Sequence, residues 1–257
     1  MTVRIIVINL DWDTGRRARI ERRLAELGLP WERLPAVDGR RLEPHHESLI
    51  DRATHVARGL EFSPGMIGCW LSHRQAHRMV AEGAEPMALI LEDDIAIGDN
   101  LPDILDQIEH GAAGRFDVIR LHRFKMHRKF VPVRSFGDGS LGFVRPTDSG
   151  LQAYVITREA AARLIAAIPR MVQRGDHALY EHWTHGLVVC SIDPPVVLHD
   201  DGGRSSIGAR PLSRKVSFRP VQWLRRKRHQ IHKKIVRRRS WHRMLRCYAK
   251  NGCLSEM

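Results

Sequence analysis

Three consecutive carboxylates, Glu92, Asp93 and Asp94, follow the apolar run Met87 to Leu91. Such a run is typical of a strand buried in a sheet, so we expect the carboxylates at the strand's carboxyl end. Ligands of open α/β sheets gather at that edge, and adjacent buried carboxylates repel one another unless a cation offsets their charge. Mg²⁺ and Mn²⁺ prefer such oxygen ligands and often share them with a substrate's phosphates. The triplet therefore predicts either a divalent metal site or a solvated acidic turn.

The segments that must position these carboxylates alternate between strand and helix. In the first predicted helix, Ile20 and Leu24 recur at helical spacing and Gly28 ends it, while Ser63 and Pro64 have the cap and first-turn preferences of a second helix. No glycine-rich phosphate-binding motif is present. The alternation indicates an α/β sheet, at least in the first half of the chain. We predict strands at 3–9, 31–37, 87–91, 116–121, 153–157 and 187–192, and helices at 14–28, 63–82 and 158–168.

The charge of the chain is concentrated at one end. The 257 residues carry a formal net charge of +13, yet residues 202–255 hold 17 Lys or Arg and no Asp or Glu. The body is slightly acidic and has the composition of an ordinary globular protein. No run approaches the roughly 18 to 20 apolar residues that span a bilayer, and the N-terminus lacks a signal-peptide pattern. We therefore expect a cytoplasmic protein whose four cysteines are free thiols.

Four motifs, considered together, resemble a known family. They occupy residues 7–10 with Arg16 and Arg17 following, then 36–39, 65–73 and 89–94. Their order and spacing resemble those of the family 25 glycosyltransferases, which include bacterial lipooligosaccharide galactosyl- and glucosyltransferases. The resemblance continues more weakly through residues 150–156, 176–179 and 199–207, and it gives no guidance beyond residue 210.

The resemblance implies a fold and a reaction. The fold is GT-A-type, a Rossmann-like mixed sheet flanked by helices, with a nucleotide-sugar half at 1–110 and an acceptor half at 111–210. The reaction is inverting, metal-dependent transfer of galactose or glucose from a UDP-sugar to a saccharide of lipooligosaccharide or surface polysaccharide. The resemblance implies Mn²⁺ or Mg²⁺ as the cation. Its role would be to stabilise the charge on the departing diphosphate.

The same resemblance implies roles for individual residues. Asp94 is the expected direct metal ligand, and Glu92 and Asp93 bind the metal, a metal-bound water or the donor ribose. His199 completes the metal site, and an imidazole ligand favours Mn²⁺ over Mg²⁺. The residues expected to bind the donor are Asn9, Arg16, Arg17, Asp38, Gly39, Ser72 and His73.

Several of these positions have simpler interpretations. The arginines also fit a solvated helix face, Asp38 with Gly39 is in isolation only a turn dipeptide, and a lone histidine is more often structural. Cys69 and His73 lie at i and i+4, but no third group is evident to orient the imidazole, so we do not predict a nucleophilic pair. We expect Cys69 to pack in the core and the glycines of this motif to allow close backbone approach.

Inverting transfer needs a general base that takes the proton of the acceptor hydroxyl. Asp176 is the first candidate, because the resemblance reaches it and the sequence places it in a loop. Asp148 is the second candidate, and both also fit a helix-capping role. The histidines do not predict a zinc site: His73 and His77 have helical spacing, but Arg74 stands where a zinc protease has its glutamate.

Residues 211–257 form a basic amphipathic segment with interleaved aromatic and aliphatic side chains. Such a segment is expected to form a helix that lies on an anionic membrane surface and brings the enzyme to a lipid-linked acceptor. A solvated disordered tail ranks second, and nucleic-acid binding ranks third because the body contains no nucleic-acid module. The alternative function is a non-catalytic anionic-surface binder on a transferase-like scaffold, against which the intact acidic triplet argues.

Overall fold

The computed structural model describes residues 3–58, 60–111, 116–123, 129–145, 149–200 and 235–236. The strands are β1 (Arg4–Asn9), β2 (Glu32–Pro35), β3 (Met87–Glu92), β4 (Ile95–Ile97), β5 (Val118–Arg120), β6 (Lys129–Phe136), β7 (Gly139–Arg145), β8 (Ala153–Thr157), β9 (Val189–Asp193) and β10 (Val197–His199). The helices are α1 (Thr14–Glu26), α2 (Pro44–Ser48), α3 (Arg52–Arg58), α4 (Pro64–Glu82), α5 (Leu101–Glu109), α6 (Arg158–Ala167), α7 (Gly175–Tyr180) and α8 (His182–His185).

Eight strands form one mixed sheet in the order β2-β1-β3-β8-β5-β9-β7-β6, and β4 pairs with β10 in a small second sheet. β1 runs parallel to β2 and β3, so Asn9 and Glu92 lie at the same edge. β8 lies antiparallel between β3 and β5, and β7 and β6 extend the sheet beyond β9. The predicted α/β architecture, a mixed sheet flanked by helices, is confirmed. Strands from residues 1–110 and 111–210 share this sheet, and the division into two functional halves stays a prediction.

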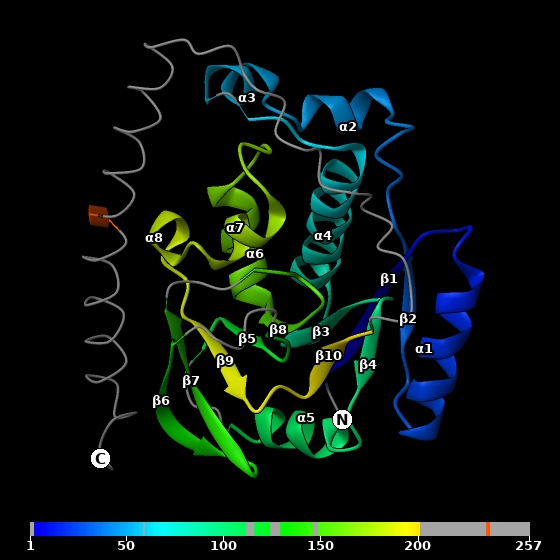
Figure 1. Ribbon diagram of the computed structural model, residues 1–257, viewed down its shortest axis with the longest axis vertical. Coiled ribbons are helices and arrows are strands. Elements are labelled where there is room, and N and C mark those ends of the chain that lie inside the picture. Colours follow the sequence, from blue (N-terminus) through cyan, green and yellow to red (C-terminus); the bar gives the residue numbers. More distant parts are fainter. Residues whose placement is uncertain are drawn as a thin grey trace.

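Apolar side chains fill both faces of the central strands. Ile5 and Val7 of β1 pack in a core with α1 and α5, while Ile6 and Ile8 pack in a second core with α4, α6 and α7. Figure 1 shows α4 and α6 on one side of the sheet and α5 on the other. Because helices cover both faces, the central strands β1, β3 and β8 have continuous buried runs rather than alternating with exposed polar residues.

The longest predicted elements are confirmed. The strands at 3–9, 87–91 and 153–157 and the helices at 14–28, 63–82 and 158–168 are present, with ends that differ by at most two residues. Ser63 caps α4 as predicted, because its hydroxyl accepts a hydrogen bond from the Met66 amide at 3.3 Å. The strands expected at 31–37, 116–121 and 187–192 are present but shorter or shifted.

The helix α5 and the β6–β7 hairpin are the largest features that were not predicted from the sequence. The α5 helix buries Leu101, Ile104, Leu105 and Ile108, whose spacing is a clear amphipathic signal in the sequence. The β6–β7 hairpin turns at Gly137, whose φ of +55° suits a residue without a side chain. The helices α2, α3, α7 and α8 and the strands β4 and β10 are short segments without a comparable sequence pattern.

The predicted basic helical segment at 211–257 lies outside the described residues, except for 235–236. Within the described ranges, no helix has both the length and the apolar character needed to cross a membrane. Cys69 and Cys190 are free thiols, as predicted.

Candidate functional site

A cavity of about 480 Å³ opens where β1 and β3 end. Its volume lies within the range of small-molecule sites, and its place at the carboxyl ends of parallel strands is the usual one in α/β proteins. The loop after β2, the first turns of α4 and the acidic triplet surround it. The residues that line it are Ile8, Leu10, Trp12, Ala36, Val37, Asp38, Gly39, Arg40, Pro64, Gly65, Gly68, Cys69, Ser72, His73, Glu92, Asp93 and Asp94.

The cavity wall depends on a close contact between the loop after β2 and α4. A Cβ atom on Gly68 would lie 2.3 Å from the carbonyl oxygen of Val37, and one on Gly39 would lie 1.8 Å from that of Pro64. The Ser72 hydroxyl joins the two segments, because it accepts from the Val37 amide at 2.8 Å and donates to the Gly68 carbonyl at 2.7 Å. The expected close backbone approach at Gly68 is confirmed, and Ser72 is buried in this joint.

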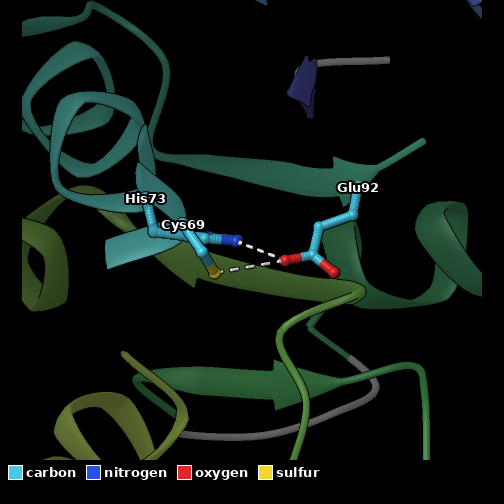
Figure 2. Close-up of side chains that lie close together, drawn as sticks. All are labelled: Cys69, His73 and Glu92. Carbon is cyan, nitrogen blue, oxygen red and sulfur yellow. Dashed lines mark hydrogen bonds and ion pairs between the residues drawn. The ribbon is translucent and has the colours of Figure 1, made fainter. Parts of the chain in front are cut away.

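Glu92 is the centre of a buried hydrogen-bond network. Figure 2 shows Cys69 and His73 of α4 pointing toward one oxygen of Glu92, with Cys69 Sγ 3.6 Å and His73 Nε2 3.1 Å from Oε1. The Nδ1 atom of His73 lies 2.8 Å from the Tyr154 hydroxyl, which His77 Nε2 also contacts at 2.8 Å. Tyr154 therefore orients the imidazole of His73, although the sequence showed no group in that role.

The ionisation of this network disfavours a thiolate at Cys69 in the metal-free protein. Burial raises the pKa of Glu92, but the hydrogen bonds and charge of His73, together with Cys69, bring it below the ordinary value. Burial, reinforced by the charge of Glu92, raises the pKa of Cys69 well above its usual range. Burial also lowers the pKa of His77 to about 3, so that this imidazole is neutral. Cys69 is a protonated donor at the cavity wall, not a nucleophile, and its expected place in the core is only partly right.

Asp93 has partners on the side of α1. Asn9 Nδ2 donates to its Oδ2 at 2.6 Å, and Arg16 Nη1 lies 3.3 Å from its Oδ1. Burial raises the pKa of Asp93, while Asn9 and Arg16 oppose the rise. Asn9 and Arg16 are both buried behind Asp93 and, like Arg17, are not among the residues that line the cavity. The structure thus places Asn9 and Arg16 behind the wall, and Arg17 is not part of it.

Asp94 lies on the opposite side, next to β10. Its Oδ2 is 3.9 Å from Nδ1 of His199, because the β4–β10 pairing sets His199 beside Ile95. Among the described residues, its buried Oδ1 accepts no hydrogen bond. Burial raises the pKa of Asp94 to about 6, and the nearby charge of Glu92 contributes to the rise. Asp94 is thus a buried carboxylate at a cavity, with one oxygen left for a ligand.

The outer lip of the cavity carries residues that the sequence did not single out. Arg40 donates to Asp38 Oδ1 at 2.9 Å, and its guanidinium lies 4.7 Å from the ring centre of Trp12. The bond from Arg40 lowers the pKa of Asp38. Trp12 is 54% exposed at this lip. A tryptophan so soon after the end of the first strand was a sequence signal that could have pointed to Trp12 as a residue of the site.

The structure describes one of the two candidate bases. Asp176 is buried in the first turn of α7, so its expected position in a loop is wrong. Its carboxylate accepts from Arg174 Nη2 at 2.8 Å and from the His177 amide at 2.9 Å, and it does not line the cavity. Asp148 lies outside the described residues.

Comparisons with known proteins identify similar chains. A family model described as Glycosyltransferase family 25 (LPS biosynthesis protein) matches residues 2–179. A glycosyltransferase 25 family member of Drosophila melanogaster is 32% identical over 179 residues, covering 65% of this chain and 28% of its own length. One of Anopheles gambiae is 33% identical over 179 residues, covering 64% of this chain and 29% of its own length. The chain thus spans less than a third of these curated relatives.

Solved structures show weaker likeness. A crystal structure of a glycosyltransferase involved in the glycosylation of the major capsid of PBCV-1 has a TM-score of 0.42 at 9% identity, over 79% of this chain and 94% of that chain. A mannose-1-phosphate geranyltransferase from Thermus thermophilus has a TM-score of 0.37 at 14% identity, over 77% of this chain and 74% of that chain. Neither similarity is close enough to bear on function.

Proposed function

Because the chain belongs to glycosyltransferase family 25, we propose that it is an inverting, metal-dependent hexosyltransferase. It moves galactose or glucose from a UDP-sugar to a saccharide acceptor of lipooligosaccharide or surface polysaccharide. The observation that carries the proposal is the buried carboxylate of Asp94, whose Oδ1 accepts no hydrogen bond from the described residues, in the wall of a cavity of about 480 Å³. A buried carboxylate oxygen without a hydrogen bond is costly, and a bound cation would offset that cost.

The residues around Asp94 fit a divalent cation. Asp94 offers a carboxylate oxygen and His199 an imidazole, a ligand pair that favours Mn²⁺, with Mg²⁺ as the alternative. Glu92 is a weaker candidate ligand, because its Oε1 already receives bonds from His73 and Cys69. Such an ion would supply Lewis-acid stabilisation of the charge on the departing UDP.

The remaining cavity wall would bind the donor. Asp38 and Gly39 lie at the lip, where Asp38 would contact the uridine by family resemblance, and Ser72 and His73 lie deeper. Ser72 would act by holding the Val37 amide in place, since its hydroxyl is already committed to that contact. Asn9 and Arg16 would not contact the donor directly but would orient Asp93.

The acceptor side needs a general base, for which we propose Asp176 first and Asp148 second. Asp176 is paired with Arg174, so the acceptor hydroxyl would compete with that ion pair. Asp176→Asn should then lower kcat while leaving the affinity for UDP unchanged. A purely structural role would instead lower the melting temperature and affect both quantities.

We also propose that the basic segment at 211–257 holds the enzyme on the anionic inner face of the cytoplasmic membrane, near a lipid-linked acceptor. Sedimentation with vesicles that contain anionic lipid, compared with neutral vesicles, tests this. Removal of residues 211–257 should abolish sedimentation, and unchanged sedimentation would contradict the proposal.

The central experiment measures binding and turnover of UDP-galactose and UDP-glucose by the full chain, with Mn²⁺ and with a chelator. We expect donor binding and slow donor hydrolysis that both require the ion, and loss of both in Asp94→Asn. Asp106→Asn is the matched control, because Asp106 is exposed on α5, away from the cavity. The absence of any metal-dependent interaction with a UDP-sugar would overturn the proposal.

A further inference from the structure

A second group of ligand atoms lies in the same cavity, apart from Asp94 and His199. Cys69 and His73 are one turn apart on α4 and point toward Glu92 at the end of β3 (Figure 2). The Sγ atom of Cys69, a ring nitrogen of His73 and a carboxylate oxygen of Glu92 all lie within 4.8 Å of one another. Thiol, imidazole and carboxylate together form a ligand set that zinc enzymes use.

Two of the three separations between these atoms match edges of a zinc tetrahedron, and the third, from sulfur to nitrogen, is at most 4.8 Å. Zinc bonds of roughly 2.0 to 2.3 Å at tetrahedral angles put a sulfur and an oxygen ligand roughly 3.5 Å apart, and a nitrogen and an oxygen ligand roughly 3.3 Å apart. The observed separations from Glu92 Oε1 are 3.6 Å to Cys69 Sγ and 3.1 Å to His73 Nε2. One ion could therefore replace the two hydrogen bonds to Glu92 while keeping both separations from its Oε1 atom close to their present values.

The surroundings of His73 resemble the outer shell of a metal site. An imidazole that binds a metal through one nitrogen usually donates a hydrogen bond from the other, which sets its tautomer and orientation. The Nδ1 atom of His73 lies 2.8 Å from the Tyr154 hydroxyl, so it can donate there while Nε2 faces Glu92. Tyr154 can in turn donate to Nε2 of His77, which lies 2.8 Å away. All three rings are buried, so the orientation of His73 is held without water.

We propose that Cys69, His73 and Glu92 bind one Zn²⁺ ion, with a fourth coordination position open to the cavity. All three residues line that cavity, which gives the ion a path of entry and an exchangeable ligand. Binding would release the Cys69 thiol proton to solvent and exchange the two hydrogen bonds for metal bonds. The thiolate selects a soft or borderline ion, so neither Mg²⁺ nor Mn²⁺ should compete effectively here. The site shares His73 and Glu92 with the proposed donor cavity, but Zn²⁺ binding can be measured without a sugar donor.

The test uses the full chain and Co²⁺, which reports the ligands of a zinc site by its spectrum. Titration should give a thiolate-to-metal charge-transfer band and visible bands of tetrahedral intensity, saturating at one equivalent. One equivalent of Zn²⁺ should remove both bands, while a large excess of Mg²⁺ should leave them. Zn²⁺ should also raise the melting temperature, because it binds only the folded chain with these three ligands in place.

Substitutions locate the site. Cys69→Ser should remove the charge-transfer band, and His73→Ala or Glu92→Gln should weaken Co²⁺ binding at least tenfold. The matched control is Cys247→Ser with Cys253→Ser, which removes two other thiols by the same exchange and should leave the spectrum unchanged. Circular dichroism of each variant checks folding, and Glu92→Gln serves if Cys69→Ser does not fold.

Three results would overturn the proposal: no charge-transfer band in the wild type, a band that persists in Cys69→Ser, or a band lost in the control. Failure here would leave the transferase proposal intact, because the Asp94→Asn experiment uses Mn²⁺ and a UDP-sugar. If the wild type shows no Mn²⁺-dependent donor binding, the transferase proposal fails, but the zinc proposal is unaffected.

Discussion

The carboxylates of Asp93 and Asp94 lie in two neighbouring regions that differ in the hydrogen-bond donors they offer. On the side of α1, Asp93 is held by Asn9 and Arg16, so its charge is balanced within the fold. On the side of β10, Asp94 has one oxygen without a hydrogen bond from the described residues, and its other oxygen lies 3.9 Å from His199. The side chains of both are mostly buried, so burial alone does not distinguish them.

The difference separates a structural carboxylate from a binding one. A fold gains little from a buried charge that it does not pair, so such a group marks a place where a ligand is expected. The same comparison places Glu92 in a third condition, ionised and hydrogen-bonded by His73 and Cys69. Four substitutions or conditions test this contrast, in order of decreasing expected effect.

The largest effect should come from Asp94→Asn. Removing the charge while keeping the shape should lower Mn²⁺-dependent transfer about 100-fold or more, because the charge that the cation must balance is lost. Steady-state rates with UDP-galactose and with UDP-glucose measure this. An activity within a few-fold of wild type would show that Asp94 is not the metal ligand.

The second effect is a pH dependence of stability in metal-free buffer. The pKa of Asp94 is raised to about 6 from an ordinary value of 3.8, so the folded state favours the protonated form. This contribution to stability is complete below pH 3.8 and is lost as pH rises through 6, a change of about 3 kcal/mol. Wild type and Asp94→Asn should therefore unfold at similar denaturant concentrations in acid, while the variant should be the more stable above neutral pH. Equal stability at pH 8 would contradict the assigned burial.

The third effect concerns the other side of the triplet. Asp93→Asn should lower the free energy of unfolding by about 2 kcal/mol, because the buried Arg16 loses an acidic partner, and this loss outweighs the relief of burying a carboxylate whose pKa is raised. Denaturant unfolding measures this loss, and Mn²⁺ affinity should change far less than in Asp94→Asn. If the two variants lose Mn²⁺ affinity equally, the contrast between the two regions is wrong.

The smallest effect is expected from Ser72, an uncharged residue of α4 that serves as a comparison for the carboxylate substitutions. Ser72→Ala should cost about 1 kcal/mol, because the Val37 amide loses its acceptor in the joint between the loop and α4. The loss should not depend on pH between 4 and 8, unlike that of the carboxylates. Thermal unfolding at both pH values measures it, and a strong pH dependence would mean that the joint is coupled to the acidic triplet.

Sequence patterns predicted the elements that bury a long apolar run or stripe. The runs of β1 and β3 and the stripe of α4 are local signals, since each side chain's environment follows from its spacing. The α5 stripe carried the same signal and was overlooked, whereas β4 and β10 are too short for any pattern. Yet it is the β4–β10 pairing that brings His199 to Asp94 across about a hundred residues of chain.

For the site, the sequence by itself determined that a cluster of carboxylates follows a buried strand and that a helix with glycines and a serine in its first turns precedes that strand. It also determined the family, because four motifs kept their order and spacing. Only the tertiary structure decided which carboxylate is paired, that Tyr154 orients His73, and that Cys69 and His73 converge on Glu92. The physical reason is that pKa values and ligand geometry depend on neighbours in space, which come from α1, α4, β8 and β10 and are remote from the triplet in sequence.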